Sequence, residues 1–179
     1  MTSIIKVDQI QTAAGGVPTV KDLGLEAGSV LQCKAQTRTI GNTGTGADIE
    51  TVSVAASGIE NAYSLNTVTI TPKYSDSLIL MQWSGMVMIA GSSAGGLDLF
   101  FTKDDTNLLT YGGNRDAAGF VYSNISQDLY SMASSQYSFT SGQTTPMTLA
   151  VKFAAYSTGK QARAAHDGTT TLTVWEIAQ

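Results

Sequence analysis

Apolar and polar residues alternate in short runs along most of this chain. In residues 50–56, Val52 and Val54 lie on one side of the expected strand, and Thr51 and Ser53 lie on the other. Residues 65–71 repeat the pattern, with Val68 and Ile70 opposite three threonines. Strict alternation over such a length is typical of a half-buried strand. The two runs therefore predict strands with one side toward a core.

Other segments extend this pattern into an all-β fold. Strands are also expected over residues 29–40, 78–90, 97–103, 108–111, 136–140, 147–156 and 171–177. Residues 104–107 would form the turn of a hairpin, and residues 118–132 stay open between a strand and an irregular segment. No amphipathic helix and no internal repeat is visible. Many short strands joined by short turns predict an antiparallel β-sandwich or jelly-roll-like knob.

The run from Leu78 to Ala90 is the most apolar in the chain, and its first residues are apolar on both sides. One side is expected to face the sandwich interior and the other a second subunit. Trp83 shares a side with Ile79 and Met81. The residues predicted to serve an oligomer contact or the core are Leu78, Leu80, Trp83, Met86, Met88 and Trp175.

The first 25 residues follow neither a strand nor a helix period. Gly15, Gly16 and Pro18 interrupt any regular element. Such a stretch cannot bury its own apolar side chains, so we expect it to dock onto another surface. The sequence therefore predicts an extended anchor over residues 1–28, followed by the knob over residues 29–179. The anchoring side chains would be Ile4, Ile5, Val7, Ile10, Val17, Leu23 and Leu25.

A family resemblance lies in this leader, in the string KVDQIQTAAGGVPTVKDLGL. It resembles the opening segment of tail-fibre and related structural proteins of marine bacteriophages. The strand expected over residues 171–177 is similar to the closing strand of trimeric fibre knobs. The resemblance implies a non-enzymatic virion protein, a short tail fibre whose N-terminal segment docks onto other virion proteins and whose knob forms a homotrimer. A head fibre or a decoration (cement) protein on the capsid is the alternative.

Composition narrows the possible partners. Charged residues are 13% of the chain and hydrophobic residues 42%, and the net charge is −4. Nucleic-acid binding needs clustered cations, whereas here only Lys160 and Arg163 lie close together, in what we expect to be a solvated loop. No signal peptide is visible, and no apolar stretch reaches the length of a membrane helix, so no membrane insertion is expected.

Candidate catalytic and metal-binding residues lack the partners that such chemistry needs. The lone Cys33 excludes an internal disulfide and is expected to be a buried, inert thiol in a strand. His166 and Asp167 could belong to a catalytic triad, but the sequence contains no Gly-x-Ser-x-Gly nucleophile elbow. Asp104 and Asp105 are expected to lie in a turn. We therefore expect no enzyme activity, no metal and no cofactor. A polysaccharide depolymerase, which needs paired carboxylates, and a secreted cytokine-like binding module are less favoured.

Aromatic and amide side chains gather in the second half of the chain. Tyr111, Asn114 and Arg115 fall close together there. Aromatic rings beside amide and hydroxyl groups suit sugar rings or protein partners. These three residues are the predicted receptor surface, for a host glycan or protein.

Overall fold

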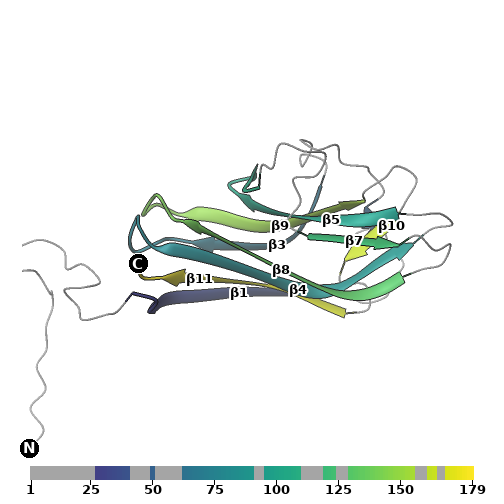
Figure 1. Ribbon diagram of the computed structural model, residues 1–179, viewed down its shortest axis with the longest axis horizontal. Helices are drawn as coiled ribbons and strands as arrows, with labels where there is room; N and C mark the ends of the chain where they lie inside the picture. The colour runs from purple at the N-terminus through teal and green to yellow at the C-terminus, as the bar shows by residue number, and fades with distance from the viewer. Residues whose placement is uncertain are drawn as a thin grey trace, which may run out of the picture.

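Two antiparallel sheets packed face to face form the knob (Figure 1). The computed structural model describes residues 27–40, 49–50, 62–90, 95–109, 119–123, 129–155, 161–164 and 168–179. Within these ranges every strand pair is antiparallel and no helix occurs. The predicted all-β sandwich is therefore confirmed.

The strands follow the chain in this order: β1 (Val30–Ile40), β2 (Ile49–Glu50), β3 (Tyr63–Ile70), β4 (Leu78–Ala90), β5 (Gly95–Lys103), β6 (Thr106–Asn107), β7 (Gly119–Ser123), β8 (Leu129–Thr140), β9 (Met147–Ala155), β10 (Gln161–Ala164) and β11 (Gly168–Ile177).

The order of strands within the sheets is that of a jelly roll. The β4 sheet runs β1-β11-β4-β10-β2, with β8 on the other side of β4. The β9 sheet runs β3-β9-β5-β6, with β7 also paired to β5. Successive long strands cross from one sheet to the other, except between β5 and β7, and this arrangement nests two Greek keys. The first and last long strands, β1 and β11, are thereby paired side by side.

The core lies between the two sheets and is centred on Trp83 of β4, which is fully buried. The indole Nε1 of Trp83 donates to Asn66 Oδ1 at 3.0 Å, so its polar atom is paired in the interior. Inward-facing residues of β4, such as Ile79 and Met81, meet Leu97 and other residues of the β9 sheet. Trp83 therefore lies with Ile79 and Met81 on the inner side of β4, a choice between its two apolar sides that the sequence left open.

Side chains of β1 close one long side of the sandwich. Gln32 Nε2 and Lys34 Nζ donate to the carbonyls of Thr71 and Thr69, each at 2.8 Å. Gln36 Oε1 accepts from the amide of Thr67 at 2.6 Å, further along the edge of β3. Unpaired backbone groups of an edge strand attract foreign strands. The side chains of β1 occupy those groups on β3 and so protect this edge.

The hairpin that joins β5 to β6 has a tighter turn than the sequence predicts. Lys103 pairs with Thr106, which leaves Asp104 and Asp105 as a two-residue turn with φ of 48° and 62°. Both values lie in the left-handed region, as in the type I′ turns that favour Asn-Gly. The turn is confirmed, but the expected return strand over residues 108–111 is wrong where it is described: β6 is Thr106–Asn107, and residues 110–111 lie outside the described ranges.

Replacing Asp105 by glycine should stabilise this turn. Glycine adopts a positive φ without steric cost, so we expect the free energy of unfolding to rise by about 0.5–1 kcal/mol. The ion pair lost, Asp105 to Lys152 at 3.2 Å, is exposed on the aspartate side and contributes little. Urea unfolding measures the change. Asp104→Gly is the control and should gain less, because Asp104 Oδ1 accepts from the amide of Thr148 at 2.8 Å.

Most strand predictions agree with the structure, and the differences are local. The run from Leu78 to Ala90 is β4, and the undecided segment contains β7 and the start of β8. Ile49–Glu50 is β2, whereas residues 51–56 of the predicted strand lie outside the described ranges. The solvated loop expected at Arg163 is wrong, since this residue belongs to β10 and pairs with Met88 of β4 and Ile49 of β2.

Candidate interaction surfaces

Two of the predicted sites lie outside the described residues. All seven anchor residues precede residue 27: Ile4, Ile5, Val7, Ile10, Val17, Leu23 and Leu25. The predicted receptor residues Tyr111, Asn114 and Arg115 fall between Leu109 and Gly119, which are the nearest residues that the structure describes. Both sites remain predictions from the sequence.

The outer side of the β4 sheet is a broad surface formed by four adjacent strands, β1, β11, β4 and β8. We call it the open face. Register and burial assign these side chains to it: Val30, Cys33, Ala35, Thr37 and Thr39 from β1; Thr169, Thr171, Thr173, Trp175 and Ile177 from β11; Leu78, Leu80, Gln82, Ser84 and Met86 from β4; and Tyr130, Met132, Ser134, Gln136, Ser138 and Thr140 from β8.

The open face is apolar toward its two ends and neutral and polar between them. Near one end Trp175 lies between Cys33 and Leu80, its partners on the two neighbouring strands. Near the other end Met86 pairs with Met132. In the middle Gln82 and Gln136 lie opposite each other, and together with Ser134 and Ser135 they line a shallow depression. The face therefore offers amides, hydroxyls and apolar groups, but no ionic group.

The six residues predicted for the core or an oligomer contact separate into two groups. Trp83 points inward and belongs to the core. The other five alternate with it and lie on the outer side of the β4 sheet: Leu78, Leu80, Met86, Met88 and Trp175. Of these only Met88 is buried, at 3% exposure. The single β4 surface expected from the sequence is thus part of a wider face to which β1, β8 and β11 also contribute.

The environment of Cys33 differs from the expectation. Its thiol was predicted to be buried, and that prediction is wrong because Cys33 is exposed. In β1 the inward positions are taken by Gln32, Lys34, Gln36 and Arg38, whose side chains reach the backbone of β3. Cys33 alternates with them and therefore lies on the open face, beside Trp175.

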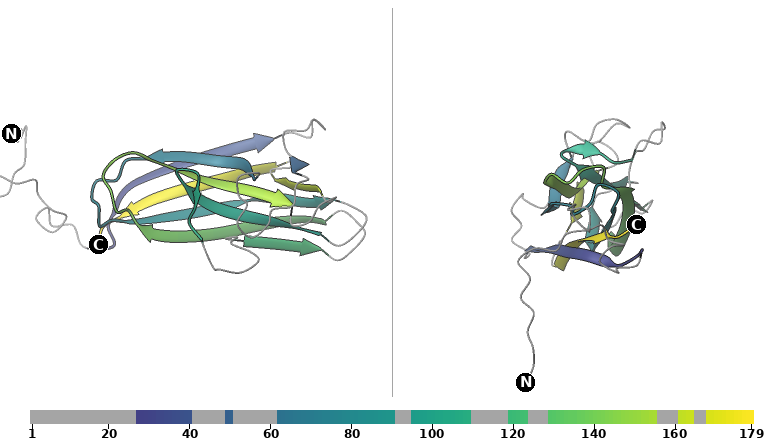
Figure 2. Two further views of the ribbon diagram at one scale, coloured as in Figure 1. Left: turned by 90° about the horizontal axis from the view of Figure 1, so that it is seen from above. Right: turned by 90° about the vertical axis from the view of Figure 1, so that its left-hand side faces the viewer.

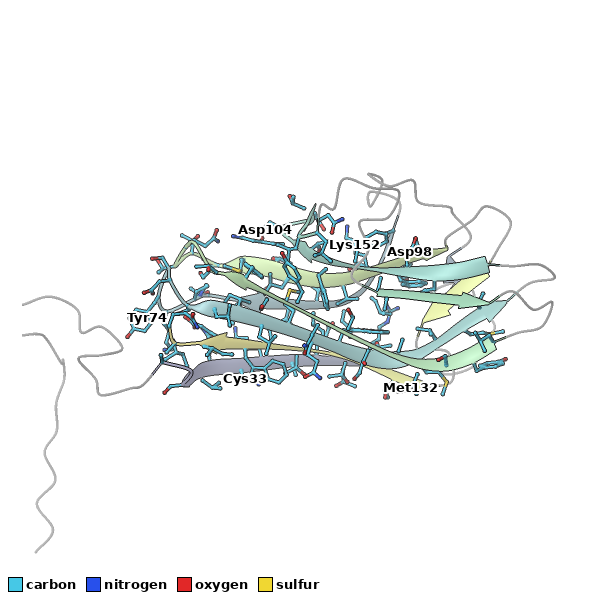
Figure 3. The ribbon with its side chains drawn as sticks, in the orientation of Figure 1. Cys33, Tyr74, Asp98, Asp104, Met132 and Lys152 are labelled. Atoms are coloured by element: carbon cyan, nitrogen blue, oxygen red, sulfur yellow. The ribbon has the colours of Figure 1, made fainter. Side chains whose placement is uncertain are left out.

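The opposite side of the sandwich has a different character. On β5, Asp98, Phe100 and Thr102 alternate with the inward residues, yet each is at most 3% exposed. Charged groups also lie on this side, including Asp104 and the ion pair between Lys152 and Asp105. Figure 3 shows Asp98, Asp104 and Lys152 on one side of the sandwich and Cys33 and Met132 on the other. The two outer sides are therefore not equivalent.

A buried carboxylate holds one end of the sandwich together. Glu176 of β11 has no exposed surface and faces inward. Its Oε1 accepts from the amides of Lys73 and Tyr74, at 2.7 and 3.2 Å, and from Ser77 Oγ at 2.8 Å. Its Oε2 accepts from Gln32 Nε2 at 2.6 Å. Glu176 thus binds the turn between β3 and β4 to the last strand and to β1.

The same end carries the start of the described chain and the C-terminus. The amide of Gly28 donates to Ala178 O at 2.8 Å, and the amide of Ala178 donates to Ser29 O at 2.9 Å. Figure 1 and the left view of Figure 2 show β1 beginning beside the C-terminus. The turn that contains Ser141 and Gly142 also bonds here, to Ser77 O and Ser75 O. We call this the terminal end.

No cluster of three or more His, Cys, Asp or Glu residues in the described ranges could hold a metal ion. The same part of the chain contains no helix long and apolar enough to cross a membrane. His166 and Asp167 lie outside it. The open face and the terminal end are thus the features that bear on function.

Comparison with known proteins adds no family to these observations. No protein-family model matches the chain, and no curated protein matches it. Function is therefore inferred from the residues and their geometry, together with the resemblance of the leader.

Proposed function

We propose that this protein is a non-enzymatic structural component of a bacteriophage particle, a short tail fibre located on the virion surface. Residues 1–26 dock onto other virion proteins, and the jelly-roll knob points away from the particle. Three copies of the chain form the fibre. The resemblance of the leader to phage fibre proteins indicates the class of particle and the number of copies.

One observation carries the anchoring part of this proposal. The chain enters the knob at Gly28, which is hydrogen-bonded to Ala178 at the terminal end. Strand β1 then runs away from that end, and its last residue, Ile40, pairs with the first residue of β11. A leader attached at one end leaves the length of the sandwich free to project. This polarity is what a fibre needs.

The composition of the knob supports a structural role over a catalytic one. The open face carries hydroxyl, amide and apolar groups without a carboxylate pair. Glycoside hydrolysis needs two carboxyl groups about 5–10 Å apart across a substrate groove. Binding of a host surface glycan or protein through Tyr111, Asn114 and Arg115 belongs to the proposal as the function of the projecting knob.

Deletion of residues 2–25 should yield a folded knob that no longer joins the particle. Because no described strand includes these residues, the secondary structure and melting temperature should stay unchanged. Incorporation is measured by immunoblotting purified particles assembled with the deleted or the full-length protein. We expect the deleted form to fall to background.

A pair of full-length variants separates apolar docking from mere length of the leader. In one, Ile4, Ile5, Val7 and Ile10 are replaced by serine, and it should be lost from the particle as the deletion is. In the other, Lys6, Asp8 and Gln9 are replaced by serine, and it should be retained. Normal incorporation of the deleted protein would show that the leader is not the anchor.

A further inference from the structure

Exposed apolar side chains are concentrated on one surface of the knob. In the described ranges the exposed large hydrophobic residues are Val30, Tyr130 and Met132, with 57%, 53% and 67% of their surface accessible. All three lie on the open face, on its two outermost strands. Partly exposed Trp175 and Leu80 lie between them. Exposed apolar side chains that gather on one surface of a soluble protein, here at both ends of the face, mark an interaction site.

Charge is absent from the same surface. None of the open-face residues is Lys, Arg, Asp or Glu, whereas about a quarter to a third of a typical solvent-exposed surface is charged. The ionic side chains that the structure describes reach from β1 and β11 toward the other sheet, lie in turns, or belong to the β9 sheet. At the border of the face, beyond its four strands, Arg163 of β10 pairs with Met88. Around a threefold axis, residues near the axis meet their own copies, so charges there would repel one another. A neutral surface avoids this repulsion and suits contact with its own copy.

The strand that borders this surface also lacks protection. Natural edge strands are blunted by charged residues, proline, bulges or covering side chains. On the far side of the sheet β1 has a bulge and carries Lys34 and Arg38. Strand β8 has twelve residues, none of them charged, proline or glycine, and it pairs with β4 without a bulge. A neighbour seated on the open face near β8 would shield this edge as well.

We infer that the open face is the contact between copies of this chain. Strands about 4.8 Å apart, rising about 3.3 Å per residue, give the face roughly 600 Å² per copy. In a ring of three copies each face is divided between two neighbours, so the three faces together bury roughly 1,800 Å² around the threefold axis. This inference deepens the proposed function and rests on it for the number of copies, three. The choice of surface rests on exposure and charge alone.

A lysine at the centre of the face tests the inference. Gln82 is exposed and pairs with Thr173 and Gln136 in the middle of the open face. In the assembly Gln82→Lys would bring like charges together in a desolvated contact, so we expect a folded monomer. Light scattering should give a mass of 18.7 kDa for this variant and about three times that for the unchanged protein. Thr148→Lys, at an exposed position of β9, is the matched control and should keep the oligomeric mass.

The single cysteine supplies a second measurement that needs no variant. Cys33 is exposed in the isolated subunit and lies on the open face beside Trp175. In the oligomer a bulky maleimide should react with it at least tenfold more slowly than in the dissociated protein at low concentration. An unchanged mass for Gln82→Lys, a monomeric full-length protein, or equal Cys33 reactivity in the two states would overturn the inference. The anchor is tested separately, because deletion of the leader leaves this face intact.

Discussion

Replacing Trp83 by alanine should remove most of the stability of the knob. Trp83 is the largest fully buried side chain that the structure describes, and it lies at the centre of the core. Truncation of a buried tryptophan costs about 3–5 kcal/mol. It also leaves Asn66 Oδ1 without its donor inside the protein, which adds about 1–3 kcal/mol. A domain has about 5–15 kcal/mol in total, so Trp83→Ala should be insoluble or unfold at low urea concentration.

Trp175→Ala is the matched control for this prediction. The same indole is removed from a partly exposed position on the open face, so the loss should be less than half as large. The alternation of apolar residues alone does not distinguish which of the two tryptophans is buried. Circular dichroism followed during urea unfolding measures both variants. Equal losses would contradict the placement of Trp83 alone in the core.

Replacing Glu176 by alanine should be the second most damaging change. Four donors converge on this buried carboxylate, and alanine would leave all four without it. Hydrogen bonds to a charged group contribute about 1.5–3 kcal/mol each, and a donor stranded in the interior costs about 1–3 kcal/mol. Some donors would reach water at the end of the sandwich, so we expect a loss of about 4 kcal/mol in the free energy of unfolding. Urea unfolding measures it.

Glu176→Gln separates the role of the charge from that of the shape. Glutamine keeps one acceptor oxygen but turns an NH₂ group toward donors, so the loss should be about half that of alanine. Thr173→Ala, on the same strand but facing outward, should change stability by less than about 1 kcal/mol. The turn between β3 and β4 should become sensitive to proteases in Glu176→Ala only. If both Glu176 variants were as stable as the unchanged protein, the carboxylate would not stabilise this end of the sandwich.

The inward position of Glu176 could have been predicted from the sequence. In β11 the alternation that places Leu172 and Val174 inward places Glu176 inward as well. A charged residue at an apolar position of such a pattern indicates a buried carboxylate with dedicated donors. The identity of those donors could not be predicted, since they lie 99 to 144 residues earlier in the chain, in the turn at Lys73 to Ser77 and in β1.

The open face was predictable only in part. The two apolar sides at the start of β4 indicated that its outer side is covered, and Leu78, Leu80 and Met86 do lie on the open face. The contributions of β1, β8 and β11 could not be read from the sequence. Each of these strands is far from β4 in the chain, and its partner is fixed by long-range pairing. The exposed Cys33 is a consequence, because only this pairing assigns the inner side of β1 to polar side chains.

The sequence by itself determined the all-β class, the position of most strands and the apolar character of both sides of β4. These properties depend on alternation between neighbouring residues, and local periodicity is written directly in the chain. Only the tertiary structure decided the jelly-roll order, the placement of Trp175 outside the core and the charge-free open face. Each of these depends on which distant strands become neighbours. That pairing is selected by how well the complete fold buries the apolar surface of all the strands together.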